Sequence, residues 1–311
     1  MRSREWCVIL NPNSGGGIKH VKWVKIQSYL KTKGLLGKVY TTKVEQNATH
    51  FVLDALKDGC RKIIIIGGDG TINNAVNGIF LQSLVSVEEV SIGLIPSGTG
   101  NDWAKTHGIP KNYKKAIDII NNENTAHQDI GEVETNSGLK KYFVNHSGVG
   151  FDGSVVNNLS RYKNFGVMSY LIASIFNFWN YQNNSATIYF NGKKTSSKFF
   201  MISVGLCRYS GGGMRLSKAP DPKDGFFDIT LAENFKKLDV IKNLFKLFNG
   251  LLHTSRKVTC FKAKEIIIEI HNNFAYGQTD GELLKSTFFK YTIKKNALKF
   301  FCKKKDSLGD V

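Results

Sequence analysis

The segment Lys62–Ile79 constrains the fold of this chain more than any other. It contains four consecutive isoleucines, a run typical of a strand buried on both faces of a parallel sheet. Gly67 and Gly68 follow, and there the backbone can turn tightly and a ligand can come close. From Thr71 onward, apolar residues recur at helix spacing. We therefore expect a strand, a glycine turn and a helix whose first N–H groups favour a phosphate, or more plainly a tight turn with Asp69 as N-cap.

Two further strands are expected to end in loops of the same kind. Trp6–Leu10 runs into NPNSGGG (Asn11–Gly17), and Val90–Ile95 runs into PSGTGND (Pro96–Asp102). The alternation of strands and helices through about residue 125 predicts a parallel α/β sheet, in which ligands bind outside the carboxyl ends of the strands. Because three such loops are expected at one edge of the sheet, we expect a phosphate-bearing ligand there. The turn at Gly67–Thr71 matches neither the P-loop nor G-x-G-x-x-G, so any nucleotide would be held in a different way.

After about residue 130 the pattern changes to β-rich segments, one of them at Tyr142–His146. Asn191-Gly192 is a strong hairpin signal between two such segments, and helices are expected within Phe165–Tyr181 and Phe235–His253. We predict a nucleotide-binding α/β domain over residues 1–128 and a mostly antiparallel second domain over residues 129–289. The strand-like tail, about residues 290–311, could return to either domain.

The charge of the chain favours an anionic partner. Lys and Arg number 43 against 25 Asp and Glu, a net charge of +18, which suits a nucleotide, a nucleic acid or an acidic membrane surface. A nucleic-acid-binding pattern of basic and aromatic residues is not evident, so no nucleic acid is expected. The five cysteines form no CxxC pair, which argues against zinc and disulfides and fits the cytoplasm. No signal peptide is expected, since residues 1–5 run directly into a predicted strand. No transmembrane segment is expected either, since the most apolar run, Phe165–Trp179, is too short to span a bilayer.

Five motifs, in their order, resemble the soluble bacterial diacylglycerol-kinase-like lipid kinases, with sphingosine kinases and, more remotely, NAD kinases as relatives. The motifs are the two loops above, GGDGT at Gly67–Thr71, GVGFDG at Gly148–Gly153 and DGE at Asp280–Glu282. The resemblance covers about residues 6 to 301. It implies a nucleotide-binding α/β domain with a parallel sheet, a β-sandwich domain for the lipid and metal, an active site in the interdomain cleft, and ATP and Mg2+ as cofactors.

The resemblance also assigns residues to the nucleotide. The expected ATP contacts are Asn11, Thr42, Gly67, Gly68, Asp69, Gly70, Thr71 and Asn73, with Ser97 and Thr99 near the phosphates. Many relatives carry a basic residue after the Ser-Gly of the first loop, where this chain has Gly16 and Gly17. Lys19, or backbone N–H groups alone, would then hold the phosphate.

The catalytic carboxylates of the family fall in DGE, so Asp280 and Glu282 are the candidates for the general base. Phosphoryl transfer requires the acceptor hydroxyl to lose a proton, which a carboxylate can take. Taken without the other motifs, the DGE segment would be interpreted as an ordinary acidic hairpin turn, because Asp-Gly is a common turn dipeptide.

Four residues are expected to organise metal ions. The resemblance implies a structural Mg2+ held by Asp221, Asp224 and a backbone carbonyl near Phe226, oxygen ligands that Mg2+ and Ca2+ prefer. It also implies that Asp129 links the catalytic Mg2+ through water. Without the resemblance, the first segment is a proline-rich turn and Asp129 lies in a linker turn.

Two apolar stretches bear on a lipid substrate. Phe165–Tyr181 is expected to be core or, in the alternative, a lipid groove. In Phe235–His253 the apolar residues keep helix spacing, and lysines lie on the other faces: Leu238, Ile241, Leu244, Phe245, Phe248 and Leu252, with Lys236, Lys237, Lys242 and Lys246. We expect this helix to pack on the sheet of its domain with its lysines in solvent, or else to dock on an anionic bilayer.

The chain is therefore expected to transfer the γ-phosphate of ATP to a hydroxyl of diacylglycerol or a related lipid, giving phosphatidic acid or an analogue. It would be cytoplasmic and peripherally associated with a membrane surface, and a homodimer is left open. One alternative is an NAD kinase-like enzyme, disfavoured by the long second domain with its separate D-x-x-D segment. The other is a non-catalytic basic module that senses nucleotides or binds nucleic acid.

Overall fold

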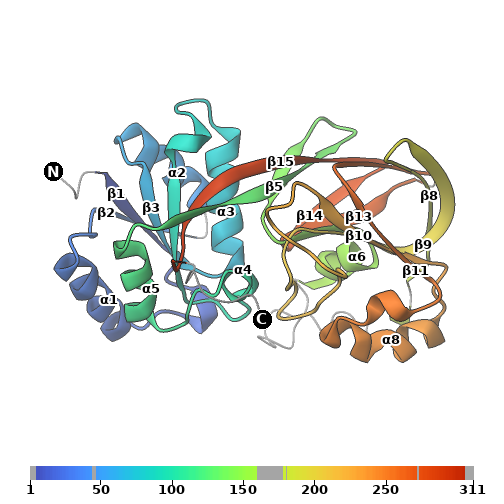
Figure 1. Cartoon of the computed structure of the whole chain (residues 1–311), viewed down its shortest axis with the longest axis horizontal. Coiled ribbons are helices and arrows are strands. Elements are labelled where there is room, and N and C mark those ends of the chain that lie inside the picture. The colour runs from blue at the N-terminus through green and yellow to red at the C-terminus, as the bar shows by residue number, and fades with distance from the viewer. Residues whose placement is uncertain (1–4, 44–46, 160–177, 180, 272, 305–311) are drawn as a thin grey trace. The chain divides into compact units, whose positions relative to one another are not determined.

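A computed structural model describes residues 5–43, 47–159, 178–179, 181–271 and 273–304. Contacts divide the chain into two units, shown in Figure 1. Unit 1 consists of residues 1–128 with 297–311, and unit 2 consists of residues 129–296. None of the helices in the described ranges is long and apolar enough to cross a bilayer.

In the described part of unit 1, the central strands of the sheet pair in parallel. The strand order is β2 (Lys38–Thr41), β1 (Trp6–Leu10), β3 (Lys62–Gly67), β4 (Ser91–Pro96) and the end of β15 (Phe288–Phe301). All five residues of β1, all six of β4 and the isoleucines of β3 are buried. Such burial is expected of strands that are covered on both faces.

Helices connect these strands. α1 (His20–Thr32) lies beside α5 (Tyr113–Asn121), while α2 (Ala48–Lys57) packs against α3 (Asp69–Leu81), as Figure 1 shows. The hydroxyl of Tyr29 in α1 donates to Asp118 Oδ1 in α5 at 2.9 Å. The short α4 (Asp102–Thr106) follows β4, and single turns of 3-10 helix occupy Ser14–Gly16 and Val87–Glu89.

The strand pairings described within unit 2 are antiparallel. One path runs through β14 (Glu282–Ser286), β13 (Ala275–Thr279), β7 (His146–Gly150), β9 (Lys193–Gly205), β8 (Asn184–Phe190), β12 (Glu265–Ile270) and β15. In addition, β10 (Phe227–Glu233) pairs with β9 and β11 (Val258–Ala263), and β5 (Thr125–Thr135) pairs with β15 and β6 (Lys140–Phe143). The helical segments described in unit 2 include α6 (Phe151–Leu159), α8 (Lys237–Asn249) and a 3-10 turn at Leu252–Thr254. The predicted fold class, a parallel α/β domain followed by a mostly antiparallel one, is confirmed.

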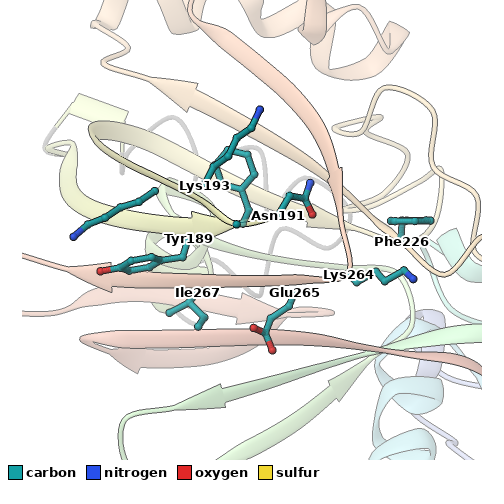
Figure 2. A pocket seen from close by; sticks show the side chains of 10 residues that line it. Tyr189, Asn191, Lys193, Phe226, Lys264, Glu265 and Ile267 are labelled. Carbon is teal, nitrogen blue, oxygen red and sulfur yellow. The ribbon is translucent and has the colours of Figure 1, made fainter.

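The Asn191-Gly192 turn joins β8 to β9 as expected, with φ of 48° and 72°. It also lines a cavity of about 610 Å³ together with Lys193, Lys264 and Phe226, which Figure 2 shows. Neither Asp280 nor Glu282 is among the residues that line this cavity. The cavity therefore shares only Phe226 with the sites predicted from the sequence.

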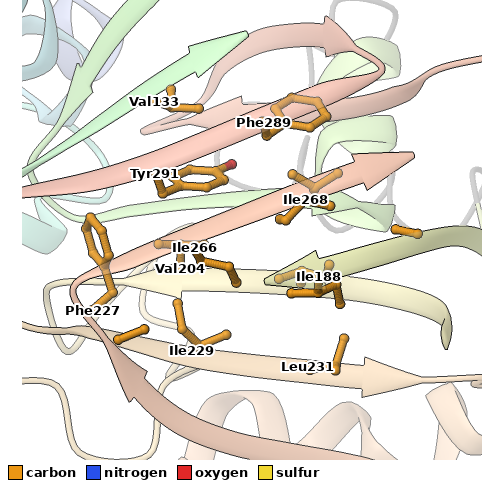
Figure 3. Packing of buried hydrophobic residues seen from close by; sticks show 14 of the residues in the cluster. Val133, Ile188, Val204, Phe227, Ile229, Leu231, Ile266, Ile268, Phe289 and Tyr291 are labelled. Carbon is orange, nitrogen blue, oxygen red and sulfur yellow. The ribbon is translucent and has the colours of Figure 1, made fainter. Parts of the chain in front are cut away.

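The larger of the two apolar clusters described in unit 2 lies between its strands. Side chains from β8, β10, β12 and β15 point toward one another, as Figure 3 shows for Ile188, Ile229 and Phe289. These three side chains are at most 1% exposed. Because burial of one such side chain is worth about 1.5–3 kcal/mol, this cluster contributes substantially to the stability of unit 2.

Two details of unit 2 differ from the sequence expectation. The predicted strand Tyr142–His146 is interrupted, because β6 ends at Phe143 and β7 begins at His146. The helix α6 was not expected; it begins directly after Gly150, whose φ of 109° changes the direction of the chain. The predicted helix within Phe165–Tyr181 falls almost wholly outside the described residues.

Candidate functional site

The three glycine-rich loops of unit 1 touch through their backbones. A Cβ on Gly68 would lie 2.8 Å from Gly98 Cα, and a Cβ on Gly15 would lie 2.0 Å from the Ser97 carbonyl oxygen. Neither position has room for a side chain, and the φ of Gly15 is +64° as well. The loops after β1, β3 and β4 are thus brought together at one edge of the sheet, as expected for parallel strands.

Side chains connect the same loops. Asn11 Nδ2 donates to Thr71 Oγ1 at 3.0 Å and so joins the first loop to the start of α3. Asp69 Oδ1 accepts the N–H of Trp103 at 3.0 Å, which joins the second loop to α4. Burial raises the pKa of Asp69. The N-cap of α3 is Gly68, so Asp69 caps the neighbouring helix α4 and not its own helix.

Two buried polar atoms of the third loop have no hydrogen-bond partner in the described part of the chain. They are Ser97 Oγ and Asn101 Oδ1. A buried polar atom left without a partner costs about 1–3 kcal/mol, so a ligand that bonds to both atoms would be favoured. Asn101 was not predicted as a site residue, although the motif PSGTGND contains it.

The other residues predicted to contact ATP belong to the same edge of the sheet. Thr42 directly follows β2, and its N–H donates to the Leu10 carbonyl oxygen at 2.8 Å. Thr71 and Asn73 are buried in the first turns of α3, whereas Gly70 and Thr99 are exposed. Lys19, the alternative to the missing basic residue, is exposed and occupies the N-cap of α1.

In unit 2 the DGE segment forms the turn between β13 and β14. Asp280 has a φ of +47°. Its carboxylate accepts the backbone N–H groups of Val144 at 2.7 Å, Asn145 at 3.0 Å and His146 at 2.9 Å. Three donors fix the orientation of the carboxylate and also explain why β6 and β7 are separate strands. Glu282, in contrast, is the exposed first residue of β14.

A buried polar network joins this turn to the GVGFDG segment. Gln278 Nε2 donates to His146 Nδ1 at 2.9 Å and to Asp152 Oδ2 at 3.1 Å, while Gln278 Oε1 accepts the N–H of Gly281 at 2.9 Å. Because Nδ1 of His146 accepts, its proton lies on Nε2, which faces Ser203 Oγ at 2.6 Å. Burial raises the pKa of Asp152 to about 6 and lowers that of His146 to about 4.

Sequence reasoning missed these network residues and two neighbours of Asp280. Asn145 Oδ1 and Thr279 Oγ1 are buried and have no hydrogen-bond partner within the described ranges. The motif GVGFDG was the only signal for Asp152, and nothing in the spacing pointed to Gln278. The turn at Asp280 is therefore surrounded by more polar groups than DGE alone predicts.

The predicted metal segment, Asp221–Phe226, rests on Asp129. The carboxylate of Asp129 is fully buried and accepts the N–H groups of Gly225 at 2.6 Å and Asn296 at 2.7 Å. Its own N–H donates to the Pro222 carbonyl oxygen at 2.7 Å. Burial raises the pKa of Asp129. Asp129 therefore fixes the path of this segment through backbone groups.

A lysine already lies beside the metal segment. Lys262 Nζ is 2.5 Å from Asp224 Oδ2 and 3.2 Å from Asp228 Oδ2. Asp221 is exposed, and its Oδ1 accepts the N–H of Lys223 at 3.0 Å. Among the described residues, no group of three or more His, Cys, Asp or Glu could hold a metal ion. The carboxylate and carbonyl oxygens fit a hard cation in kind, but such an ion would share Asp224 with Lys262.

Comparison with solved structures supports this fold. A crystal structure of a diacylglycerol kinase from Bacillus anthracis superposes with a TM-score of 0.73 at 22% identity, covering 97% of each chain. An NAD kinase from Archaeoglobus fulgidus in complex with ATP gives a TM-score of 0.54 at 13% identity, covering 96% of this chain and 94% of that one. At such identities the likeness concerns the fold alone.

Sequence comparison identifies the family as well as the fold. The family model of the diacylglycerol kinase catalytic domain matches residues 5–133, and that of the YegS C-terminal NAD kinase beta sandwich-like domain matches residues 146–302. A protein of Mycobacterium tuberculosis named diacylglycerol kinase is 28% identical over 237 residues, 75% of each chain. With both halves matched in this order, the chain belongs to the family of diacylglycerol-kinase-like lipid kinases.

Proposed function

We propose that this protein is an ATP-dependent lipid kinase that transfers the γ-phosphate of ATP to a hydroxyl of diacylglycerol or a related lipid. The product would be phosphatidic acid or an analogue. The observation that carries the proposal is the convergence of three glycine-rich loops around buried polar atoms without partners. The name of the M. tuberculosis relative and the ATP complex of the A. fulgidus NAD kinase support it.

Unit 1 holds the nucleotide in this proposal. Asn11, Thr42 and the residues Gly67–Asn73 lie along it, with Ser97 and Thr99 at the phosphates. The absence of side chains at Gly68 and Gly98 lets the loop backbones approach each other, and their N–H groups replace the lysine of a P-loop. Ser97 Oγ and Asn101 Oδ1 gain partners from the nucleotide or its bound water.

Unit 2 supplies the general base. Asp280 or Glu282 takes the proton of the lipid hydroxyl as the hydroxyl oxygen attacks the γ-phosphorus. The three backbone donors keep Asp280 in one orientation, so it can act without reorganisation. Glu282 is exposed and has no such restraint, which makes the two carboxylates separable by mutation.

The metal assignments complete the proposal. Mg2+, when bound, neutralises charge on the phosphate oxygens during transfer. Asp221, Asp224 and the Phe226 carbonyl oxygen would hold a structural ion, and Asp129 would hold Gly225 of the same segment in place and link the catalytic ion through water. We propose that the protein acts in the cytoplasm as a peripheral protein at a membrane, because its substrate is a lipid and its net charge is +18.

Transfer of labelled γ-phosphate tests this function. Wild-type protein, ATP and Mg2+ are incubated with a panel of lipids in mixed micelles, and NAD is included as a second acceptor. Label on a lipid supports the proposal and names the substrate. Label on NAD alone, or on no acceptor while ATP still binds, overturns it.

A further inference from the structure

The helix α8 exposes an apolar face. Four residues spaced three or four apart form one stripe, with these exposed fractions: Leu238 67%, Ile241 55%, Phe245 82% and Phe248 51%. We call these four residues the α8 stripe. Figure 1 shows α8 outside the strands of unit 2. Phe245 is the most exposed of the large apolar residues in the described part of the chain.

A different side of α8 attaches it to unit 2. Val240 and Leu247 pack against the buried cluster that contains Phe200, Phe235 and Leu252, and Asn243 between them is 8% exposed. The expectation that the apolar residues pack on the sheet is therefore wrong for the α8 stripe and right for Leu252. The side chain of Leu244 lies outside the described part. The four residues of the α8 stripe therefore do not cover the buried cluster of unit 2.

Positive charge lies on both borders of the stripe. At 3.6 residues per turn, Lys237 falls on one border and Lys242 on the other, and both are exposed. The one acidic residue of the helix, Asp239, is paired with Lys257 at 2.6 Å. Trp179 is 58% exposed, and Lys237 Nζ lies 5.0 Å from the centre of its ring. An apolar stripe with basic borders and an adjacent tryptophan is complementary to the interface of an anionic bilayer.

We propose that the α8 stripe, together with Trp179, Lys237 and Lys242, docks this protein on an anionic lipid bilayer. The apolar side chains enter the headgroup–acyl boundary, and the lysines contact acidic headgroups. The inference rests on the proposed function, since a diacylglycerol kinase must reach a substrate that resides in a bilayer. A second copy is a poorer occupant, because two stripes in contact would bring their lysine borders together.

Vesicle sedimentation without ATP tests the docking surface. Wild-type protein is mixed with vesicles of phosphatidylglycerol and phosphatidylcholine in equal parts, or of phosphatidylcholine alone. We expect binding to the anionic vesicles that weakens as salt is added. The double variant Phe245→Ser with Phe248→Ser should bind at least about tenfold more weakly, because two large apolar groups no longer enter the bilayer. Equal binding of this variant and the wild type overturns the inference.

Matched controls distinguish binding through the α8 stripe from non-specific hydrophobic adsorption to vesicles. Leu81→Ser removes an apolar residue of similar exposure, 53%, at the end of α3, and should bind as the wild type does. Lys237→Glu with Lys242→Glu should lose binding to anionic vesicles, by about fivefold or more for each lysine, while Lys115→Glu on α5 loses less. Circular dichroism verifies that each variant is folded. If ultracentrifugation shows a wild-type dimer that the Phe245→Ser variant dissociates, the stripe joins two copies and the bilayer proposal is wrong.

The kinase assay distinguishes this inference from the proposed function. A short-chain diacylglycerol dispersed without vesicles should be phosphorylated equally by wild type and stripe variant, whereas long-chain diacylglycerol in anionic vesicles should be phosphorylated more slowly by the variant. Loss of rate on both substrates would contradict a docking role. If no lipid is phosphorylated but the stripe still governs vesicle binding, the proposed function fails and the docking surface stands.

Discussion

Asp280 and His146 are joined by two hydrogen bonds of 2.9 Å, one in each direction. The N–H of His146 donates to the Asp280 carboxylate, and the N–H of Asp280 donates to the His146 carbonyl oxygen. Val144 and Asn145 donate to the same carboxylate. The proposed base is thus held in position before a substrate arrives, and the same bonds make it part of the structure of unit 2.

Asp280→Asn should lower stability as well as activity. An asparagine offers one acceptor oxygen, and its NH2 group would face a backbone N–H where the second carboxylate oxygen now accepts. We expect the free energy of unfolding to fall by about 1–3 kcal/mol. Urea unfolding of wild type and variant measures the difference. An unchanged midpoint would show that the three backbone bonds contribute nothing.

Gly68→Ala and Gly70→Ala separate loop packing from nucleotide binding. A Cβ at position 68 would lie 2.8 Å from Gly98 Cα, so Gly68→Ala should cost about 1–3 kcal/mol of stability. A Cβ at position 70 meets nothing within 4 Å, so Gly70→Ala should unfold like the wild type. If phosphate lies against this turn, Gly70→Ala should nevertheless bind ATP about tenfold more weakly. Calorimetric titration of the two variants checks this, and unchanged affinity in Gly70→Ala would place the phosphates elsewhere.

Asp152 should make stability depend on pH. Burial raises its pKa to about 6, from 3.8, so the folded protein holds this proton at pH values where the unfolded chain has lost it. Its contribution is therefore fully present below about pH 4 and is lost as the pH rises to about 6. A shift of this size corresponds to about 3 kcal/mol.

Asp152→Asn removes this dependence. The stability of the variant relative to wild type should fall by up to about 3 kcal/mol between about pH 7 and about pH 4. His146 titrates in the opposite sense, because its pKa is lowered to about 4, but it is present in both proteins and cancels in the comparison. Urea unfolding at the two pH values measures the effect. A difference that does not vary with pH would mean that folding leaves the pKa of Asp152 unshifted.

The structural Mg2+ is tested through Lys262. Because its ammonium pairs with Asp224, Lys262→Met should make Asp224 more available to a cation. Mg2+ is then expected to raise the Tm of Lys262→Met more than that of wild type. Each kcal/mol of stabilisation by bound Mg2+ corresponds to a rise of about 2–4 °C in the Tm. Asp221→Asn should abolish the increase in both backgrounds. If the Tm of none of these proteins is higher with Mg2+ than with EDTA, this segment does not bind a structural Mg2+.

The fold was predictable where local sequence determines it. The isoleucines Ile63–Ile66 specify a strand covered on both faces, and Asn191-Gly192 specifies a two-residue hairpin. The convergence of the glycine-rich loops follows from the geometry of parallel strands. Each of these inferences uses residues that are neighbours in the chain.

The remaining features depend on contacts between distant residues. Gln278 reaches Asp152 across 126 positions and His146 across 132, and no spacing pattern announces such polar pairs. Lys262 in β11 reaches Asp224 in the turn before β10. The amphipathic pattern of α8 showed that the helix has two kinds of face, but only the structure shows that Val240 and Leu247 are the ones that pack.

The central claim is phosphoryl transfer from ATP to a lipid hydroxyl with a DGE carboxylate as base. The most direct measurement is the transfer of labelled γ-phosphate to diacylglycerol by wild type, Asp280→Asn and Glu282→Gln, with the folded fraction of each protein determined beforehand. We predict a labelled lipid with the wild type and a rate lower by about 10²–10⁴ in one of the two variants, which identifies the base. Transfer that survives in both variants, or no transfer by folded wild type that binds ATP, would contradict the account.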